Sequence, residues 1–202
     1  MIGELLLPRQ CAGCRAPGSA LCRRCKEQLA TPPFRSSPTV AVHVPVFALG
    51  PYADPHRGVI LAMKEKKNLV VRRHAGAVVA AALDYLGARG EIPPGAHLVP
   101  APTRPKSARA RGGDPVAAVC SHAGRSTYSV LRLADDTPDQ GGLDEAGRRR
   151  NLQGKVSISA VPPGPVVVVD DVVTTGATLQ ASVEKLLARG GDVRACLVLA
   201  AA

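Results

Sequence analysis

The chain has 202 residues, enough for one main domain with a buried core and a small appendage. Hydrophobic residues make up 46% of it, but there is no Trp and only two Phe, so the core must be aliphatic. The formal net charge of +10 favours an anionic partner, either a phosphorylated small molecule or nucleic acid. The scarcity of aromatic residues argues against a nucleic-acid surface built on base stacking.

The start of the chain shows no sign of secretion or membrane insertion. No apolar run is long enough to span a bilayer. The first ten residues lack a basic start and include Glu4, which is untypical of a signal peptide. The residues before Cys11 are not the small ones expected at a lipid-attachment site. A cytoplasmic location follows by default, and there cysteines are more often metal ligands or buried thiols than disulfides.

Four cysteines near the N-terminus have the spacing C-x2-C-x7-C-x2-C: Cys11, Cys14, Cys22 and Cys25. Two such pairs can bring four thiolates around one tetrahedral Zn²⁺, with the Pro-Gly-Ser turn between them. Four thiolates leave no open coordination position, so we expect a structural metal. Disulfides or free thiols are the alternatives.

A Pro- and Ser-rich linker, residues 30–39, is the predicted boundary. It divides the chain into a zinc-binding module with its linker, residues 1–35, and a larger domain, residues 40–202. In the larger domain, residues 40–50 read as extended, and helical spacing follows in residues 52–68 and 74–90. A basic cluster lies between these helices and is expected to be a solvated face, with Lys64 its best candidate for ligand binding: Lys64, Lys66, Lys67, Arg72 and Arg73.

Two further stretches combine basic residues with loop composition. A strand over residues 97–102 runs into a loop that carries Thr103, Arg104 and Lys106, and a helix follows from Pro115. After a strand at 128–133, residues 137–156 are polar and Gly-rich. This composition fits a mobile hood that closes over a ligand, or a plain surface loop.

The most informative stretch runs from Val166 to Leu179. Four consecutive valines predict a strand buried on both faces. Asp170 and Asp171 follow, then a small-residue loop around Gly176 and a helix. The loop amides and the helix N-terminus can bind a phosphate, and the glycine would let the chain approach it closely. Ionised aspartates only accept hydrogen bonds, so they suit hydroxyls or a cation. Together these groups suit a sugar phosphate; the alternative is a Val-rich strand with an Asp-rich turn.

Residues 166–178 resemble the phosphoribosyl diphosphate (PRPP) signature of the type I phosphoribosyltransferases. The resemblance implies that Asp170 and Asp171 hold the ribose 2- and 3-hydroxyls. It assigns the 5-phosphate to Val172, Val173, Thr174, Thr175, Gly176, Ala177 and Thr178. The diphosphate side is expected to use Thr103, Arg104, Lys106 and Lys64, and the hood to bring Arg148, Arg149 and Arg150.

The order of these segments resembles the ComF-like phosphoribosyltransferase family over nearly the whole chain. The four cysteines are similar to that family's zinc module, LVPAP to its Val-Pro-x-Pro loop, and QGGLDEAGRRRNLQG to its hood segment. Gly113 and Asp114 depart from it, because Phe and Asn are usual there. The implied fold is α/β, a parallel sheet flanked by helices, with the ligand at the carboxyl ends of the strands.

The expected activity is transfer of a phosphoribosyl group from PRPP, with Mg²⁺ on the diphosphate and release of pyrophosphate. The acceptor is unknown. In purine-salvage relatives an Asp in the loop serves as base, whereas this chain has Thr174. The alternative is a non-catalytic protein of the competence type that binds PRPP or a nucleotide. Such a protein could also handle single-stranded DNA during DNA uptake, mainly by contacts to the phosphate backbone of the DNA. A homodimer is left open.

Overall fold

The computed structural model describes residues 10–64, 68–134 and 155–202. The helices are α2 (Arg23–Leu29), α3 (His56–Lys64), α4 (Leu69–Ala88), α5 (Pro105–Ala110), α6 (Pro115–Ser121) and α8 (Ala177–Leu187). The strands are β1 (Phe34–Ser36), β2 (Val46–Ala48), β3 (His97–Pro100), β4 (Leu131–Leu133), β5 (Val156–Ile158), β6 (Pro165–Val173) and β7 (Asp192–Ala201). None of the helices in these ranges is long and apolar enough to cross a membrane.

The main sheet has five strands in the order β1-β2-β7-β6-β3. Neighbouring strands from β2 to β3 are parallel, and β1 pairs antiparallel with β2 at one edge. β4 and β5 form a separate antiparallel pair. The chain is therefore an α/β protein with a mixed, mostly parallel sheet, in agreement with the expected fold class at this level.

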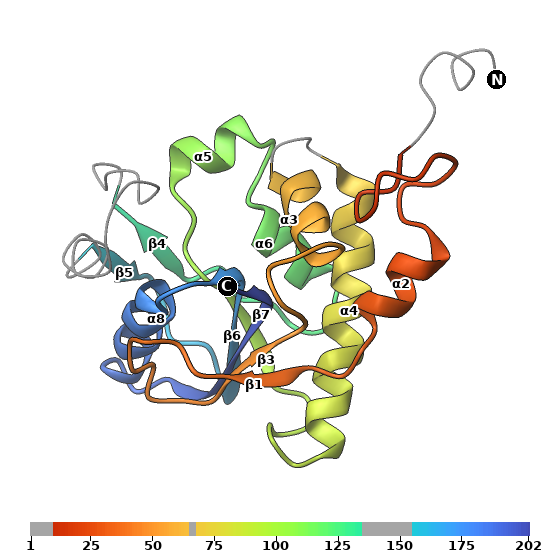
Figure 1. Cartoon of the computed structure of the whole chain (residues 1–202). Helices are drawn as coiled ribbons and strands as arrows, with labels where there is room; N and C mark the ends of the chain where they lie inside the picture. Colours follow the sequence, from red (N-terminus) through yellow and green to blue (C-terminus); the bar gives the residue numbers. More distant parts are fainter. Residues whose placement is uncertain (1–9, 65–67, 135–154) are drawn as a thin grey trace.

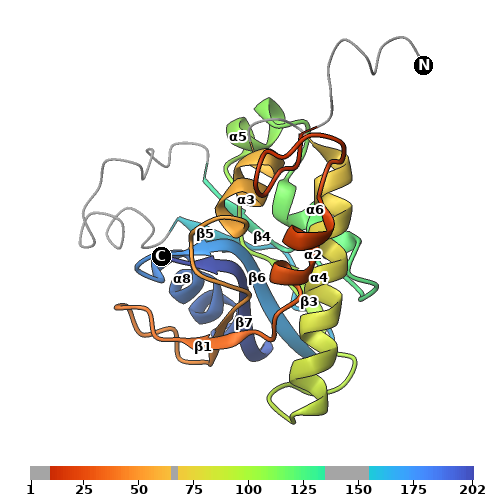
Figure 2. The ribbon, with the colours of Figure 1, turned by 45° about the vertical axis from the view of Figure 1, so that its right-hand side comes forward.

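Helices cover both faces of the sheet (Figures 1 and 2). On one face α2, α3, α4 and α6 share a buried cluster with Val167 and Val169 of β6. On the other face α8 and the β4–β5 pair pack against Val166 and Val168. All four valines are completely buried, as expected for a strand with no solvent-facing side.

The cysteine-containing segment packs against the rest of the chain. Cys11, Cys25 and Leu29 belong to the same buried cluster as α3 and α4. At Gly58 of α3, a Cβ atom would lie 2.3 Å from the carbonyl oxygen of Ala12, so only a glycine fits this contact. The division into two domains stays a prediction, but the two parts share one core.

Several elements differ from the sequence-based expectation. The predicted linker contains β1, and residues 40–45 lie outside the strand expected there, since β2 begins at Val46. Part of the basic loop after β3 is helical, because Pro105 occupies the first turn of α5. α4 begins five residues early, at Leu69, because the Asn68 side chain accepts a hydrogen bond from the Val71 amide and caps the helix.

The expectation that Arg72 lies on a solvated face is wrong. The side chain is 2% exposed. Its guanidinium donates hydrogen bonds to the carbonyl oxygen of Met63 at 3.1 Å and to that of Arg111 at 2.9 Å. Arg72 thus stabilises the C-terminal ends of α3 and α5, where a positive charge also complements the helix dipoles.

The contact at Gly58 can be tested against a matched glycine in α4. We expect Gly58→Ala to destabilise the protein by about 1–3 kcal/mol, because a backbone atom occupies the space the methyl group needs. Gly87→Ala should stabilise it by about 0.5–1 kcal/mol, because a Cβ there meets no atom within 4 Å and alanine is the better helix former. Urea denaturation of both variants measures the difference. Equal stability of the two variants would contradict the tight packing of the cysteine-containing segment on α3.

Candidate functional site

The two aspartates lie within β6, beyond the point where β3 ends. Pro100 at the end of β3 pairs with Val169, whereas β6 continues alongside β7 as far as Val173. The strand therefore extends further than the Asp170–Asp171 end that the sequence suggested. This extension carries the acidic pair to the carboxyl edge of the parallel sheet, where α/β proteins generally bind ligands.

Asp171 forms an ion pair with Lys64, the last residue of α3. The Lys64 Nζ atom lies 2.5 Å from Asp171 Oδ2, and the two side chains are 24% and 15% exposed. Side chains alternate along a strand, so Asp171 projects toward the same face as Val167 and Val169, which is the face that α3 covers. The structure thus brings together two of the predicted ligand-binding residues. A ribose hydroxyl that bonds Asp171 must compete with the lysine.

Asp170 has an unusual protonation state. Burial raises the pKa of its carboxyl group, and the neighbouring charge of Asp171 raises it further. The Asp171 amide, which donates to Asp170 Oδ1 at 2.8 Å, and the Lys64 ammonium lower it again, leaving a pKa of about 8. The raised pKa favours the protonated form of Asp170, which can donate a hydrogen bond, whereas the sequence suggested two ionised, acceptor-only carboxylates.

The loop after β6 presents backbone amides that have no partner in the part of the chain that the structure describes. Within residues 10–64, 68–134 and 155–202, no acceptor bonds the backbone N–H of Thr174, Thr175 or Gly176. Gly176 is the N-cap of α8, and the Ala177 amide donates to the Thr175 hydroxyl at 3.4 Å. Three successive free amides at a helix N-terminus form a cradle that suits an anion.

The structure gives two further reasons for a glycine at position 176. It has a φ of +92°, a left-handed conformation that favours glycine. A Cβ atom added to it would lie 2.8 Å from the Cβ atom of Pro38. The missing side chain therefore makes room for residue 38 of the N-terminal half, and the carbonyl oxygen of Val40 is also close, at 3.3 Å from that Cβ position.

A cavity of about 210 Å³ lies at the end of β3. Thr103, a predicted diphosphate-binding residue, is in its wall, and so is Asp114. Asp114 caps α6 by accepting hydrogen bonds from the amides of Val116 and Ala117, at 2.8 and 3.1 Å. Its charge also contributes to the raised pKa of Asp170, although neither Asp170 nor Asp171 lines the cavity. The complete lining is Pro100, Ala101, Thr103, Pro105, Ala108, Asp114, Ala117, Ser129, Leu131, Arg132 and Leu133.

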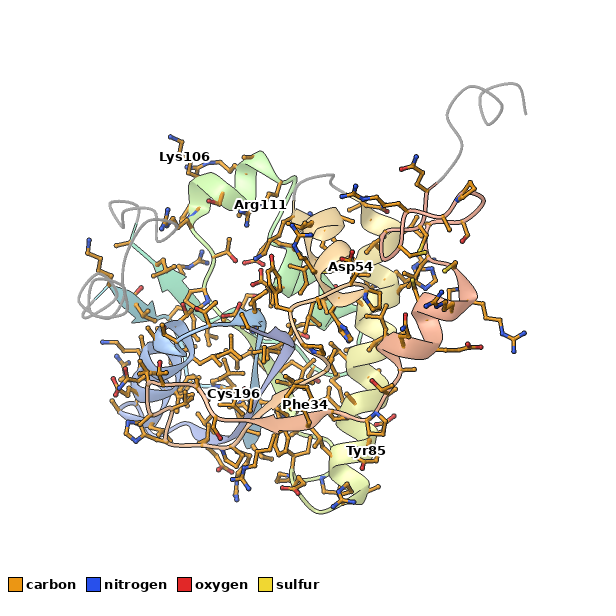
Figure 3. All side chains as sticks on the ribbon, in the orientation of Figure 1. Phe34, Asp54, Tyr85, Lys106, Arg111 and Cys196 are labelled. Carbon is orange, nitrogen blue, oxygen red and sulfur yellow. The ribbon has the colours of Figure 1, made fainter. Side chains whose placement is uncertain are left out.

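The other described diphosphate candidates, Arg104 and Lys106, lie on or next to α5. Arg104 is half-buried and precedes α5 as its N-cap residue. Lys106 is exposed on α5 and points outward, whereas Arg111 lies on the side of α5 nearer to α3 (Figure 3). The hood residues Arg148, Arg149 and Arg150 lie outside the described residues, in the segment that connects β4 and β5.

The four N-terminal cysteines form a compact cluster. Their Sγ atoms all lie within 4.8 Å of one another, and those of Cys14 and Cys22 are 3.7 Å apart. A tetrahedral zinc ion bound about 2.3 Å from each sulfur holds the sulfurs roughly 3.8 Å apart, so the cluster fits zinc. Among the described residues, it is the one group of three or more His, Cys, Asp or Glu side chains that could hold a metal ion.

Backbone amides already stabilise one thiolate in the cluster. Burial by itself raises the pKa of Cys11, but hydrogen bonds from the amides of Cys22, Cys14 and Gly13 outweigh it and lower the pKa to about 6. The Cys22 amide lies 3.3 Å from the Cys11 sulfur. Amide donors around a sulfur favour its deprotonated form, which is the form that binds metal.

Comparison with protein-family models and with curated proteins finds no match for this chain. The fold and site therefore define its class by themselves: an α/β protein with a mostly parallel sheet and a four-cysteine cluster that could bind zinc.

The protonation of Asp170 predicts a pH-dependent stability. Its pKa in the folded state lies above its ordinary value of 3.8, so the folded protein binds more protons than the unfolded chain between about pH 4 and pH 8. The contribution of Asp170 to the free energy of unfolding therefore falls across this window as the pH rises. Asp170→Asn cannot ionise, so it should be more stable than the wild type above pH 8, with the difference shrinking toward pH 4.

Urea denaturation at pH 5, 7 and 9 tests this prediction. Asp192→Asn is the control, because Asp192 sits in an exposed pair with Arg194 and its loss should give no comparable gain at pH 9. An Asp170→Asn variant that is less stable than the wild type at pH 9 would contradict the raised pKa.

Proposed function

We propose that the chain is a PRPP-binding phosphoribosyltransferase of the ComF-like type, which transfers a phosphoribosyl group with release of pyrophosphate. The observation that supports this most is the arrangement at the end of β6. The acidic pair and two valines are followed there by three amides without a partner among the described residues and by a helix N-terminus. Few ligands besides a sugar phosphate need a phosphate cradle next to groups that bind neighbouring hydroxyls.

In this proposal the ribose hydroxyls bind Asp170 and Asp171. A diol offers both donors and acceptors. The raised pKa of Asp170 favours a protonated carboxyl that can donate, and Asp171, which pairs with Lys64, can accept. The amides of Thr174, Thr175 and Gly176 receive the 5-phosphate. The cradle and the acids then fix both ends of the ribose.

Lys64 forms an ion pair with Asp171 and is the best candidate for the diphosphate among the described residues. When ribose displaces it from Asp171, its ammonium becomes available to a phosphate on the same side of the sheet. Thr103 and Arg104, which follow the end of β3, would contribute further contacts in this proposal. Cations that face the departing diphosphate stabilise the negative charge that develops on it.

Magnesium would reach the site with its ligand. The described residues include no group of three carboxylates placed to hold a cation, which agrees with the tendency of Mg²⁺ to keep several waters and to bind phosphate oxygens. When bound it would neutralise part of the diphosphate charge.

The acceptor stays open, and so does turnover. Thr174, which is exposed, stands where an acidic base would serve a purine acceptor, and a hydroxyl is no base near neutral pH. This observation keeps a second candidate, a protein that binds PRPP or a nucleotide without turnover. Incubation with PRPP, Mg²⁺ and a panel of bases and amines, with pyrophosphate as the readout, separates the two. PRPP binding without pyrophosphate release from any acceptor would favour the non-catalytic candidate.

Calorimetric titration with PRPP and with ribose 5-phosphate, both with Mg²⁺, tests the assignment of Lys64 and Asp171. Asp171→Asn should weaken both ligands by at least about tenfold, because both carry the ribose hydroxyls. Lys64→Met should weaken PRPP far more than ribose 5-phosphate, because only PRPP carries the diphosphate. Lys106→Met is the control and should leave both affinities nearly unchanged, since Lys106 is exposed on the outside of α5. A Lys64→Met variant that weakens both ligands equally would refute the diphosphate role.

The cysteine cluster is proposed to bind one structural zinc ion through Cys11, Cys14, Cys22 and Cys25. We expect one zinc per chain, and a lower melting temperature after removal by a chelator, because the metal site and α3 share one core. Cys14→Ala should abolish stoichiometric zinc although this thiol is exposed, whereas Cys120→Ala, at a fully buried thiol outside the cluster, should keep it. Full zinc content in Cys14→Ala would exclude the four-thiolate site.

A further inference from the structure

The segment between β1 and β2 lies against the anion cradle. We call residues 37–45 the strap; it runs alongside the N-terminal end of α8 in both views (Figures 1 and 2). The backbone N–H of Val40 donates a hydrogen bond of 2.9 Å to the carbonyl oxygen of Thr175. The Thr39 hydroxyl lies 3.4 Å from the same oxygen. Val40, which is distant in the sequence, thus donates a hydrogen bond to a backbone carbonyl of the cradle.

This hydrogen bond determines where one cradle amide points. The peptide unit that joins Thr175 to Gly176 is planar and trans, so its C=O and its N–H point in opposite directions. Because the carbonyl points at the strap, the Gly176 amide must point away from the strap. That amide is one of the three without a partner among the described residues.

The strap is itself held in place on both sides of Val40. Pro38 fills the space where a side chain on Gly176 would lie. His43 contacts Glu184 of α8 at 3.3 Å, and the Cys196 amide donates to the Pro45 carbonyl at 2.8 Å. Val40 and Val42 are both 4% exposed. The strap can therefore hold the Thr175 carbonyl in one orientation.

We propose that Val40 is a positioning residue for the phosphate cradle, and that its backbone N–H keeps the Gly176 amide directed at the bound phosphate. This inference rests on the proposed function, since it assigns the Gly176 amide to the 5-phosphate of the ligand. Without the Val40 bond, the Thr175–Gly176 peptide can rotate and turn its N–H away. The cradle must then become ordered when it binds an anion, and this ordering lowers its affinity for the anion.

Replacement of the Val40 amide by an ester tests the proposal in the full-length chain. α-Hydroxyisovaleric acid at position 40 removes the N–H but keeps the valine side chain and the fold of the strap. The same exchange at Ala41 is the matched control, because Ala41 is exposed and its N–H has no partner among the described residues. The probes are ribose 5-phosphate and inorganic phosphate, titrated by calorimetry and by ¹H–¹⁵N NMR.

We expect the ester at position 40 to weaken ribose 5-phosphate by roughly tenfold, and the ester at position 41 to leave its affinity unchanged. In the wild type the Gly176 amide resonance should move downfield on binding. In the position-40 ester that shift should be lost, while the Thr174 amide still responds. A purely structural role for Val40 would lower the melting temperature without this selective loss.

Two results would overturn the proposal. If the position-40 ester binds ribose 5-phosphate as the wild type does and keeps the Gly176 shift, the strap does not position the cradle, while the proposed function stands. If the wild type binds neither probe and shows no shift at Thr174 or Gly176, the proposed function fails and takes this inference with it.

Discussion

The burial of β6 on both faces is the constraint on which the rest of the structure depends. Val166 to Val169 are fully buried between two helical layers, and β6 pairs with a parallel strand on each side. Because the valines cannot shift without exposing apolar surface, the residues that follow them are also fixed. Asp170 and Asp171, which follow the valines in the same strand, therefore have a fixed position at the carboxyl edge of the sheet. The free energy that holds them there comes from apolar burial, not from contacts of the acids themselves.

The acidic pair, Asp170 and Asp171, lowers the stability of the folded state. Burial and a like charge beside it raise the pKa of Asp170, and Asp171 is paired with one lysine from another element. A carboxyl group with a strongly raised pKa at the ligand edge of an α/β sheet is typical of functional sites, where stability is given up for chemistry. The same pair in a protein without a ligand there would be hard to rationalise.

The sequence predicted those features that depend on local pattern. Four valines before two aspartates and a Gly-centred loop give the strand, the acids and the start of α8, and the cysteine spacing gives the cluster. The sequence-based prediction was wrong where residues distant in the sequence determine the structure. Arg72 belongs to a basic cluster of the kind that is usually solvated, but its burial depends on hydrogen bonds to the carbonyl oxygens of Met63 and Arg111. No local pattern relates Val40 to Thr175, which is 135 residues further along. The start of α6 at Pro115 was predicted, and the structure shows Asp114 as its cap.

The contact between Gly58 and the Ala12 carbonyl has a practical consequence for work with shortened versions of this chain. Removal of the first thirty residues would leave the apolar side of α3 and α4 exposed to water, because Leu21, Cys25 and Leu29 cover it. Such a truncated protein would be prone to self-association. Crystallisation or binding studies are therefore better begun with the intact N-terminus, and with zinc supplied during expression.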